Sequence, residues 1–327
     1  MKEKLTYISN ARIIGILLVV FGHSYPLTGE IPKFFDIIRN FIYCFHMPLF
    51  VFVSGYLVVN ANSVERYGTK SYLERRFVKL FVPYLGLSIL GYFPKVLVSG
   101  FINDEVQFGF LYFVKTLLIP RDGVWGHFWF IPMLFAMAVI SVLYIKFLRQ
   151  NRNLIIFACI ITFVLIYMPD CTKWLGINDI KDYLFWYLIG LLFADTNIVA
   201  KYSSLKRGLI CLLSGCVAFV LFGMKAYNAI VAIFMVIGIL MICVHMDLGK
   251  IKILGMIGNY SFSIFLLSWP AQAVVEVIGN RILDLPFMIN MAMMFFAGIL
   301  VPLIIVYIIN KLRGIPHMKK IGLLIGM

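Results

Sequence analysis

Charged residues are scarce in this chain of 327 residues. Only 13% of the residues are charged, whereas 62% are hydrophobic and the mean hydropathy is +0.95. Soluble domains carry about 25% charged residues, so this shortage excludes an ordinary water-soluble domain. Apolar runs long enough to cross a bilayer, about 18 residues or more, recur along the whole chain instead. The composition therefore indicates a polytopic membrane protein.

Several signatures of soluble enzymes are also absent. The sequence has no P-loop, no G-x-G-x-x-G motif and no H-E-x-x-H motif, so dedicated nucleotide-binding and zinc-protease chemistries have no support. Its six cysteines include no C-x-x-C pair and lie mostly in apolar segments, which argues against a disulfide framework or a zinc site. We therefore expect no metal ion and no permanently bound cofactor.

The apolar segments predict an all-α membrane bundle of about ten transmembrane helices, in one domain over residues 1–327. No small-x-small cleavage site follows the first apolar segment, which is therefore interpreted as a helix and not as a signal peptide. Segment 104–120 is only partly apolar and is expected to be re-entrant or interfacial. The expected helices span 5–27, 34–59, 74–100, 126–148, 153–170, 180–195, 206–223, 226–246, 255–278 and 286–312.

The formal net charge of +14 is explained by topology. An even number of helices places both termini on one side of the membrane. If that side is cytoplasmic, the cytoplasmic segments hold 20 of the 29 Lys and Arg residues, as the positive-inside rule requires. The basic excess thus predicts cytoplasmic termini, and it is no evidence for a nucleic-acid partner.

A cation and an imidazole bracket the apolar part of the first predicted helix. Arg12 and His23 are eleven positions apart, which is three turns plus about 20°, so they share a face and lie about 16 Å apart along the axis. Charged residues in a bilayer are costly and usually face a polar interior. As an alternative, Arg12 snorkels to lipid headgroups and His23 hydrogen-bonds a neighbouring helix. The shared face favours a functional cleft.

Three cations enter the third predicted helix together. Arg75 and Lys79 are four positions apart and share a face, and Arg76 lies beside them. This arrangement suits an anionic ligand such as a phosphate group, although anchoring to anionic lipid is the alternative. Pro83 removes a backbone hydrogen bond one turn later, which can open the helix there.

The second predicted helix contains the run FHMPLFVFVSGYL at 45–57. Its Pro48 and the Ser54-Gly55 pair permit a kink and a close backbone approach. His46 in the same run is interpreted as a structural histidine.

Two later runs also carry polar and aromatic residues. The run GHFWFIPML covers residues 126–134. Its His127 and Trp129 are expected at the external boundary of the bilayer, where aromatic residues are common. They are candidates for binding an acceptor. In NYSFSIFLLSWP, residues 259–270, the polar side chains are interpreted as packing groups.

These sequence motifs, in this order along the chain, resemble those of the acyltransferase-3 family of bacterial integral-membrane acyltransferases. The resemblance is greatest to its polysaccharide O-acetyltransferase branch, often described as fucose 4-O-acetylase-like, and it spans about residues 5–312. The matching motifs are R-x10-H in the first helix, PLF…SGY in the second, the basic start of the third followed by a proline, H-x-W-F at 127–130 and S-x-x-I-F-L-L at 261–267.

The resemblance implies a multi-pass enzyme of the bacterial inner or plasma membrane. It implies transfer of an acetyl group, less often another acyl group, from acetyl-CoA or another acyl-CoA to a sugar hydroxyl of a surface polysaccharide or its lipid-linked precursor. It assigns catalysis to His23 and the donor side to Arg12, Arg75 and Lys79. Two positions depart from the family pattern, because Lys79 replaces an arginine and Ser268 stands where a histidine is frequent. The implied partners are the acyl-CoA donor, the carbohydrate acceptor, the lipid bilayer and glycan-assembly proteins.

The residues themselves give this chemistry a mechanism. A histidine has an unperturbed pKa near 6.5 and suits a general base, and an acyl-histidine intermediate is also open to it. Arg12, Arg75, Arg76 and Lys79 are expected to hold the CoA phosphates. A transporter or flippase that uses Arg12 and His23 as an anion site and proton relay is a second hypothesis. A non-enzymatic partner in glycan assembly is a third.

Overall fold

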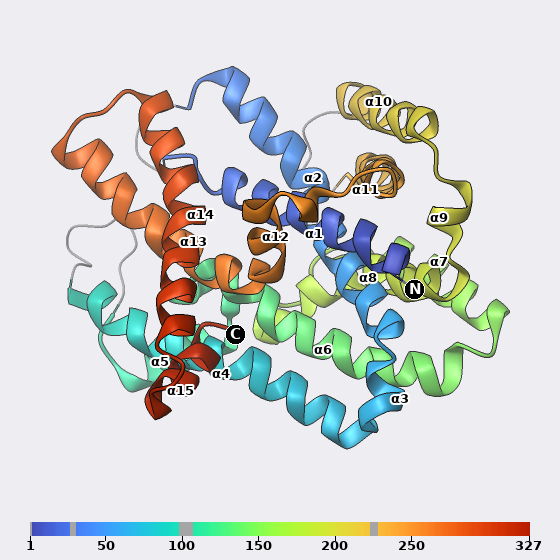
Figure 1. Cartoon of the computed structure of the whole chain (residues 1–327), viewed down its shortest axis with the longest axis horizontal. Helices are drawn as coiled ribbons and strands as arrows, with labels where there is room; N and C mark the ends of the chain where they lie inside the picture. The colour runs from blue at the N-terminus through green and yellow to red at the C-terminus, as the bar shows by residue number, and fades with distance from the viewer. Residues whose placement is uncertain (1, 27–30, 98–106, 223–227) are drawn as a thin grey trace. The chain divides into compact units, whose positions relative to one another are not determined.

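The computed structural model describes residues 2–26, 31–97, 107–222 and 228–327 (Figure 1). None of these residues forms a strand, and each of the ten predicted helices has a helical counterpart among them. The all-α prediction is therefore confirmed for this part of the chain. The predicted helix ends at 27, 98–100, 223 and 226–227 lie outside the described residues, as does the start of the segment 104–120.

The chain divides into two compact units, each of which is described by itself. The first comprises residues 1–53, 196–322 and 327. Its elements are α1 (Lys2–Gly22), most of α2 (Lys33–Asn60), α9 (Ile198–Tyr202), α10 (Leu205–Phe222), α11 (Ala229–Cys243), η6 (Leu248–Lys250), α12 (Lys252–Asn259), α13 (Ser261–Glu276), the π-helical η7 (Val277–Ile282), α14 (Phe287–Lys311) and most of α15 (Pro316–Leu324).

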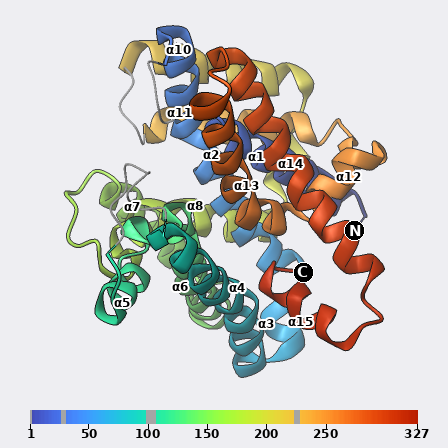
Figure 2. The same cartoon turned by 90° about the vertical axis from the view of Figure 1, so that its left-hand side faces the viewer.

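Within the first unit, α1 packs against α11, α12, α13 and α14. Two further pairs of neighbouring helices, α10 with α11 and α13 with α14, lie side by side in both views (Figures 1 and 2). The first helix of the chain is thus surrounded by helices that come from its last third.

The second unit comprises residues 54–195 and 323–326. Its elements are the end of α2, α3 (Ser63–Tyr67), α4 (Thr69–Leu97), α5 (Phe110–Leu118), η2 (Pro120–Asp122), η3 (Gly126–Trp129), α6 (Phe130–Leu143), the π-helical η4 (Tyr144–Leu148), α7 (Arg152–Leu165), η5 (Trp174–Gly176), α8 (Ile177–Thr196) and the end of α15. The prediction that the chain forms one acyltransferase domain stays a prediction.

Six helices are long and apolar enough to cross a membrane, judged by length and composition among the described residues. They are Lys33–Asn60, Thr69–Val96, Gly126–Leu148, Leu205–Phe222, Ser261–Asn280 and Phe287–Lys311. Three shorter apolar helices span Thr6–Gly22, Arg152–Leu165 and Ala229–Cys243. The number of helices that cross the membrane and the side of the termini stay predictions.

Large apolar side chains lie on the outside of several helices. On α10, Leu213, Val217 and Val220 are all exposed, and Phe157 and Ile160 are exposed on α7. Such surfaces are costly in water but match the hydrocarbon interior of a bilayer. Their placement supports a membrane protein.

Prolines and glycines have different consequences in these helices. Helix α2 continues through Pro48, and α4 continues through Pro83. Pro83 therefore does not interrupt α4, although the sequence suggested that the helix could open there. The close approach predicted around Gly55 is present within the second unit. A Cβ atom added at Gly55 would collide with the backbone carbonyl of Tyr187 on α8, so the absence of a side chain at Gly55 brings α2 and α8 together.

Candidate active site

Side chains from two other helices hold the end of α1. A helix leaves its last carbonyl groups without partners of its own, and here the Tyr43 hydroxyl donates to the carbonyl of Gly22 at 2.8 Å. The carbonyl of Val20 accepts from Gln272 Nε2 at 2.8 Å and from the Ser24 hydroxyl at 2.6 Å. Gln272 Nε2 also donates to the Ser24 hydroxyl at 2.9 Å. The predicted catalytic histidine follows Gly22 directly.

Aromatic rings border the imidazole of His23. The ring stacks on Trp269 of α13, with centroids 5.1 Å apart and planes 21° apart. Tyr43 lies 6.2 Å from His23 and 5.0 Å from His46, centroid to centroid. The buried His46 binds the carbonyl of Ile42 through Nδ1 at 2.9 Å. A carbonyl oxygen only accepts hydrogen bonds, so Nδ1 of His46 carries a proton.

Arg12 lies on the same regular helix as Gly22, eleven positions before His23. The rise of an α-helix places the two positions about 16 Å apart along the axis. The Arg12 side chain is half-buried, and its Nε atom is buried without a hydrogen-bond partner among the described residues. A guanidinium group normally uses its donors, and the role of Arg12 in donor binding stays a prediction.

The three predicted donor-side cations begin α4 in the second unit. Arg75 is exposed, and its guanidinium lies 4.4 Å from the centroid of the Tyr67 ring. Arg76 is half-buried, 5.4 Å from the ring of Tyr72. Lys79 is exposed one turn further along. The structure thus groups these three side chains at one end of α4.

His127 and Trp129 lie in η3 and are both buried, with 4% and 9% of their surface exposed. The Trp129 indole stacks on Tyr183 of α8, with centroids 5.3 Å apart, and the guanidinium of Arg121 lies 4.3 Å from it. Little of the Trp129 indole surface is therefore accessible to a sugar. Its candidate role as an acceptor-binding residue stays a prediction.

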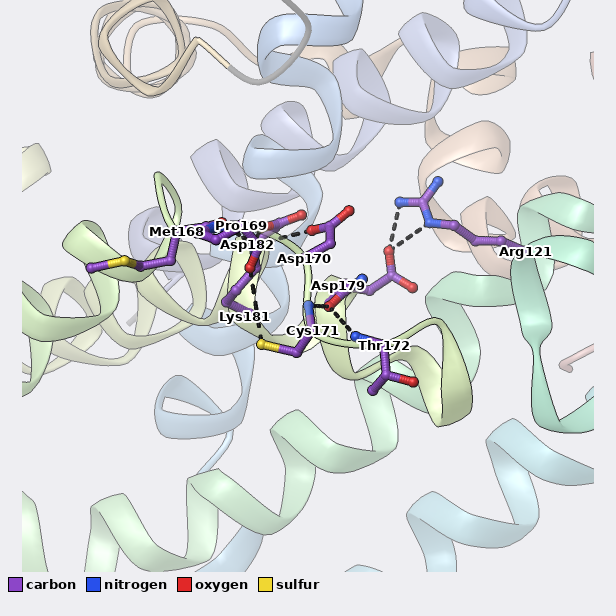
Figure 3. Close-up of polar contacts among 10 residues, drawn as sticks. Arg121, Met168, Pro169, Asp170, Cys171, Thr172, Asp179, Lys181 and Asp182 are labelled. Carbon is purple, nitrogen blue, oxygen red and sulfur yellow. Dashed lines mark hydrogen bonds and ion pairs between the residues drawn. The ribbon is translucent and has the colours of Figure 1, made fainter.

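The guanidinium that lies on the Trp129 ring also forms an ion pair. Arg121 donates from Nε at 2.8 Å and from Nη2 at 2.6 Å to the same oxygen of Asp179, which is 3% exposed (Figure 3). Burial raises the pKa of Asp179 to about 6, although Arg121 acts in the opposite direction. Nearby, Lys181 bridges Asp170 at 3.2 Å and Asp182 at 3.1 Å.

Arg75, Arg76 and Lys79 lie near the start of α4, whereas η3 contacts α4 further along its length. The ring of Phe128 in η3 is 6.1 Å from that of Tyr84, and Trp125 Nε1 donates to the carbonyl of Leu87 at 3.0 Å. Tyr84 is nine positions after Arg75, which corresponds to about 13 Å along a helix. Within the second unit, the predicted donor-side residues at the start of α4 are therefore separated, along the axis of α4, from the predicted acceptor-side residues in η3.

Sequence reasoning missed Tyr43, Trp269 and Gln272 around His23, and it missed Arg121 and Asp179 beside Trp129. Only Gln272 gave a usable signal, since an uncharged amide in an apolar helix usually has a partner or a function. The other four are residue types that are common at membrane boundaries and in loops.

These features define an all-helical, multi-pass membrane protein with a histidine fixed at the end of one helix. The chain belongs to the acyltransferase-3 family, because the family model described as an acyltransferase domain matches residues 5–311. One relative is the nodulation protein NolL of Sinorhizobium fredii (strain NBRC 101917 / NGR234), which is 29% identical over 236 residues. That match covers 67% of this chain and 58% of NolL. No solved structure matches the chain.

Family membership confirms the resemblance that the motifs predicted. It does not favour the transporter alternative, because the matching model describes an acyltransferase domain over nearly the whole chain.

Proposed function

We propose that this protein is a membrane O-acyltransferase that moves an acetyl group from acetyl-CoA to a sugar hydroxyl of a cell-surface polysaccharide or its precursor. The family supports acyl transfer. The observation that carries the proposal is the imidazole of His23, which is stacked on Trp269 at the end of the helix that bears Arg12.

The proposed reaction uses His23 as a general base. A sugar hydroxyl is a weak nucleophile near neutral pH, so the imidazole takes its proton while the oxygen attacks the thioester carbonyl carbon. The new C–O bond forms and the C–S bond breaks. The departing CoA thiolate then takes a proton from the imidazolium, which restores the neutral base. Attack by the imidazole itself, with an acyl-histidine intermediate, is the competing route.

The proposed donor side is cationic. Arg12, Arg75, Arg76 and Lys79 bind the phosphate groups of CoA, because charge-assisted hydrogen bonds to phosphate are among the strongest that side chains make. The buried, unpartnered Nε of Arg12 supports this role. Lys79 contributes charge without the two-pronged geometry of an arginine.

The proposed acceptor side includes His127 and Trp129, in the bacterial inner or plasma membrane. The acceptor is a polysaccharide or a lipid-linked glycan, and glycan-assembly proteins are its expected partners. The separation of η3 from the start of α4 supports donor and acceptor approaching from different ends of the second unit.

The test uses the full chain in lipid nanodiscs with acetyl-CoA carrying a labelled acetyl group. The acceptor is surface polysaccharide extracted from cells that lack the gene. We expect labelled O-acetyl groups on the polysaccharide by NMR, and a loss of at least about 100-fold in the His23→Ala variant. His245→Ala, which changes an exposed histidine beyond α11, is the matched control.

Three outcomes would contradict the proposal in different ways. Undiminished transfer by folded His23→Ala protein would overturn the role of His23. Labelled acyl-histidine trapped on the native protein would replace the general base by a nucleophile. Glycan flux across liposomes without acetyl-CoA consumption would support transport instead.

A further inference from the structure

Helix α13 presents two side chains to the end of α1. Trp269 stacks on the imidazole of His23. Gln272, nearly one turn later on α13, donates to the carbonyl of Val20 and to the hydroxyl of Ser24. Residues three apart on a helix lie on one face, so a single face of α13 contacts the histidine ring, a backbone carbonyl before it and the side chain of the residue after it.

The orientation of the Gln272 amide follows from its partners. The carbonyl of Val20 can only accept a hydrogen bond, so the NH2 group of the amide must face it. Gln272 is fully buried, and its Oε1 atom has no hydrogen-bond partner among the described residues. The amide is therefore held in the site through its nitrogen alone.

The packing around Gln272 leaves it little freedom. A Cβ atom added at Gly298 of α14 would lie 2.8 Å from Gln272 Nε2 and 2.7 Å from Cγ1 of Val20. Such distances are too short for real contacts, so α14 closes over the amide because Gly298 has no side chain. Three helices thus meet at this hydrogen bond.

From α2, the Tyr43 hydroxyl donates to the carbonyl of Gly22. Tyr43 and Gln272 together are called the carbonyl clamp here. From two different helices they bind the carbonyls of Gly22 and Val20, both in the last turn of α1 before His23. Gln272 also binds the hydroxyl of Ser24, the residue after His23.

We propose that Gln272 is a positioning residue for His23: it fixes the end of α1, through the carbonyl clamp, so that the imidazole is stacked on Trp269 in the orientation that the reaction needs. This inference rests on the proposed function, in which His23 is the base. A base that is displaced by about 1 Å can lose about 100-fold in rate.

We expect that the clamp can be weakened without unfolding the protein. In Gln272→Met the carbonyl of Val20 keeps its bond from the Ser24 hydroxyl, and the volume of the side chain is nearly unchanged. Tyr43→Phe removes only a hydroxyl and is the second variant, because it releases the other half of the clamp.

The control is a second fully buried amide in the same unit. Asn290 of α14 donates to Asn280, and its Oδ1 atom is also buried without a partner among the described residues. It lies against Gly279 of η7. Asn290→Leu therefore removes a comparable amide without touching the end of α1.

Two readouts test the proposal in nanodiscs. The first is acetyl transfer per folded protein, with kcat and the KM for acetyl-CoA measured separately. The second is the rate at which diethyl pyrocarbonate modifies His23, read by mass spectrometry, which needs no activity. We expect both clamp variants to lower kcat 10- to 100-fold, leave KM within twofold and raise the modification rate at least threefold. Asn290→Leu should change none of these values more than twofold.

The outcomes separate this inference from the proposed function. Native kcat and a native modification rate in both clamp variants would overturn the positioning role. If the native protein transfers no acetyl group, the proposed function fails, while the modification rate of His23 still reports whether Gln272 and Tyr43 fix the imidazole.

Discussion

The imidazole of His23 lies nearly parallel to the indole of Trp269, with ring centroids 5.1 Å apart and an interplanar angle of 21°. An aromatic pair of this kind contributes about 0.5–1.5 kcal/mol beyond its buried area. The contact is made by residues from α13 and from the end of α1, so it fixes an orientation that α1 alone does not define. For a base that must meet a substrate hydroxyl, orientation is as important as basicity.

Trp269→Ala should therefore reduce kcat more than it reduces binding. We expect a loss of about 10- to 100-fold in kcat, with the KM for acetyl-CoA within twofold of native, because a misoriented base affects the chemical step. Trp269→Phe retains a stacking ring and should stay within about threefold. Radiolabelled acetyl transfer by purified protein measures both. Equal activity of the alanine and native proteins would show that the stack does not orient His23.

Arg12→Gln should weaken donor binding without weakening the fold. A charge-assisted hydrogen bond is worth about 1.5–3 kcal/mol, so we expect the KM for acetyl-CoA to rise roughly 10- to 100-fold. The melting temperature should not fall, since Arg12 Nε has no partner to lose among the described residues. Arg12→Lys should lie between the two proteins. A lower melting temperature with an unchanged KM would identify Arg12 as a structural anchor instead.

The stability of the protein should depend on the charge of Asp179, which precedes the span predicted over 180–195. Its pKa is raised from 3.8 to about 6, mainly by burial. The folded state then binds more protons than the unfolded state, so this carboxyl group favours folding below about pH 4 and loses that effect as the pH rises to about 6. The change is roughly 1–3 kcal/mol.

Asp179→Asn tests this pH dependence. The melting temperature in detergent at pH 4.5 minus that at pH 7 should be more positive in the native protein than in the variant, because an amide does not titrate in this range. The same difference between the two pH values in both proteins would contradict the prediction.

Gly55→Ala should destabilise the second unit. The new methyl group would meet the backbone carbonyl of Tyr187, which cannot rotate away like a side chain, and overpacking of this kind costs about 1–3 kcal/mol. Gly109→Ala is the control, since a Cβ atom there meets nothing within 4 Å and its φ of 162° is extended backbone. Thermal unfolding in detergent compares them. Equal melting temperatures would mean that α2 and α8 separate without cost.

Local patterns predicted candidate residues along single helices. The R-x10-H spacing predicted one helix for Arg12 and His23, and the structure places Arg12 within α1 and His23 directly after its last residue. The four-residue spacing predicted that Arg75 and Lys79 share one end of another helix, and both lie in the first turns of α4. The same reasoning treated His127 and Trp129 as boundary residues. It gave no sign that Arg121 and Tyr183 cover much of the Trp129 indole, because the Tyr183 contact joins distant segments and the Arg121 contact depends on the turn between η2 and η3.

The sequence by itself determined the class of this protein. Apolar runs of membrane length leave no other stable arrangement than helices, and the order of short motifs identified the acyltransferase-3 family. Only the tertiary structure decided what surrounds His23. Gln272 and Ser24 are 248 positions apart, and apolar helices in a bilayer gain no hydrophobic energy from choosing one neighbour over another. Their pairing depends on small residues such as Gly298 and on a few hydrogen bonds, which helical periodicity does not reveal.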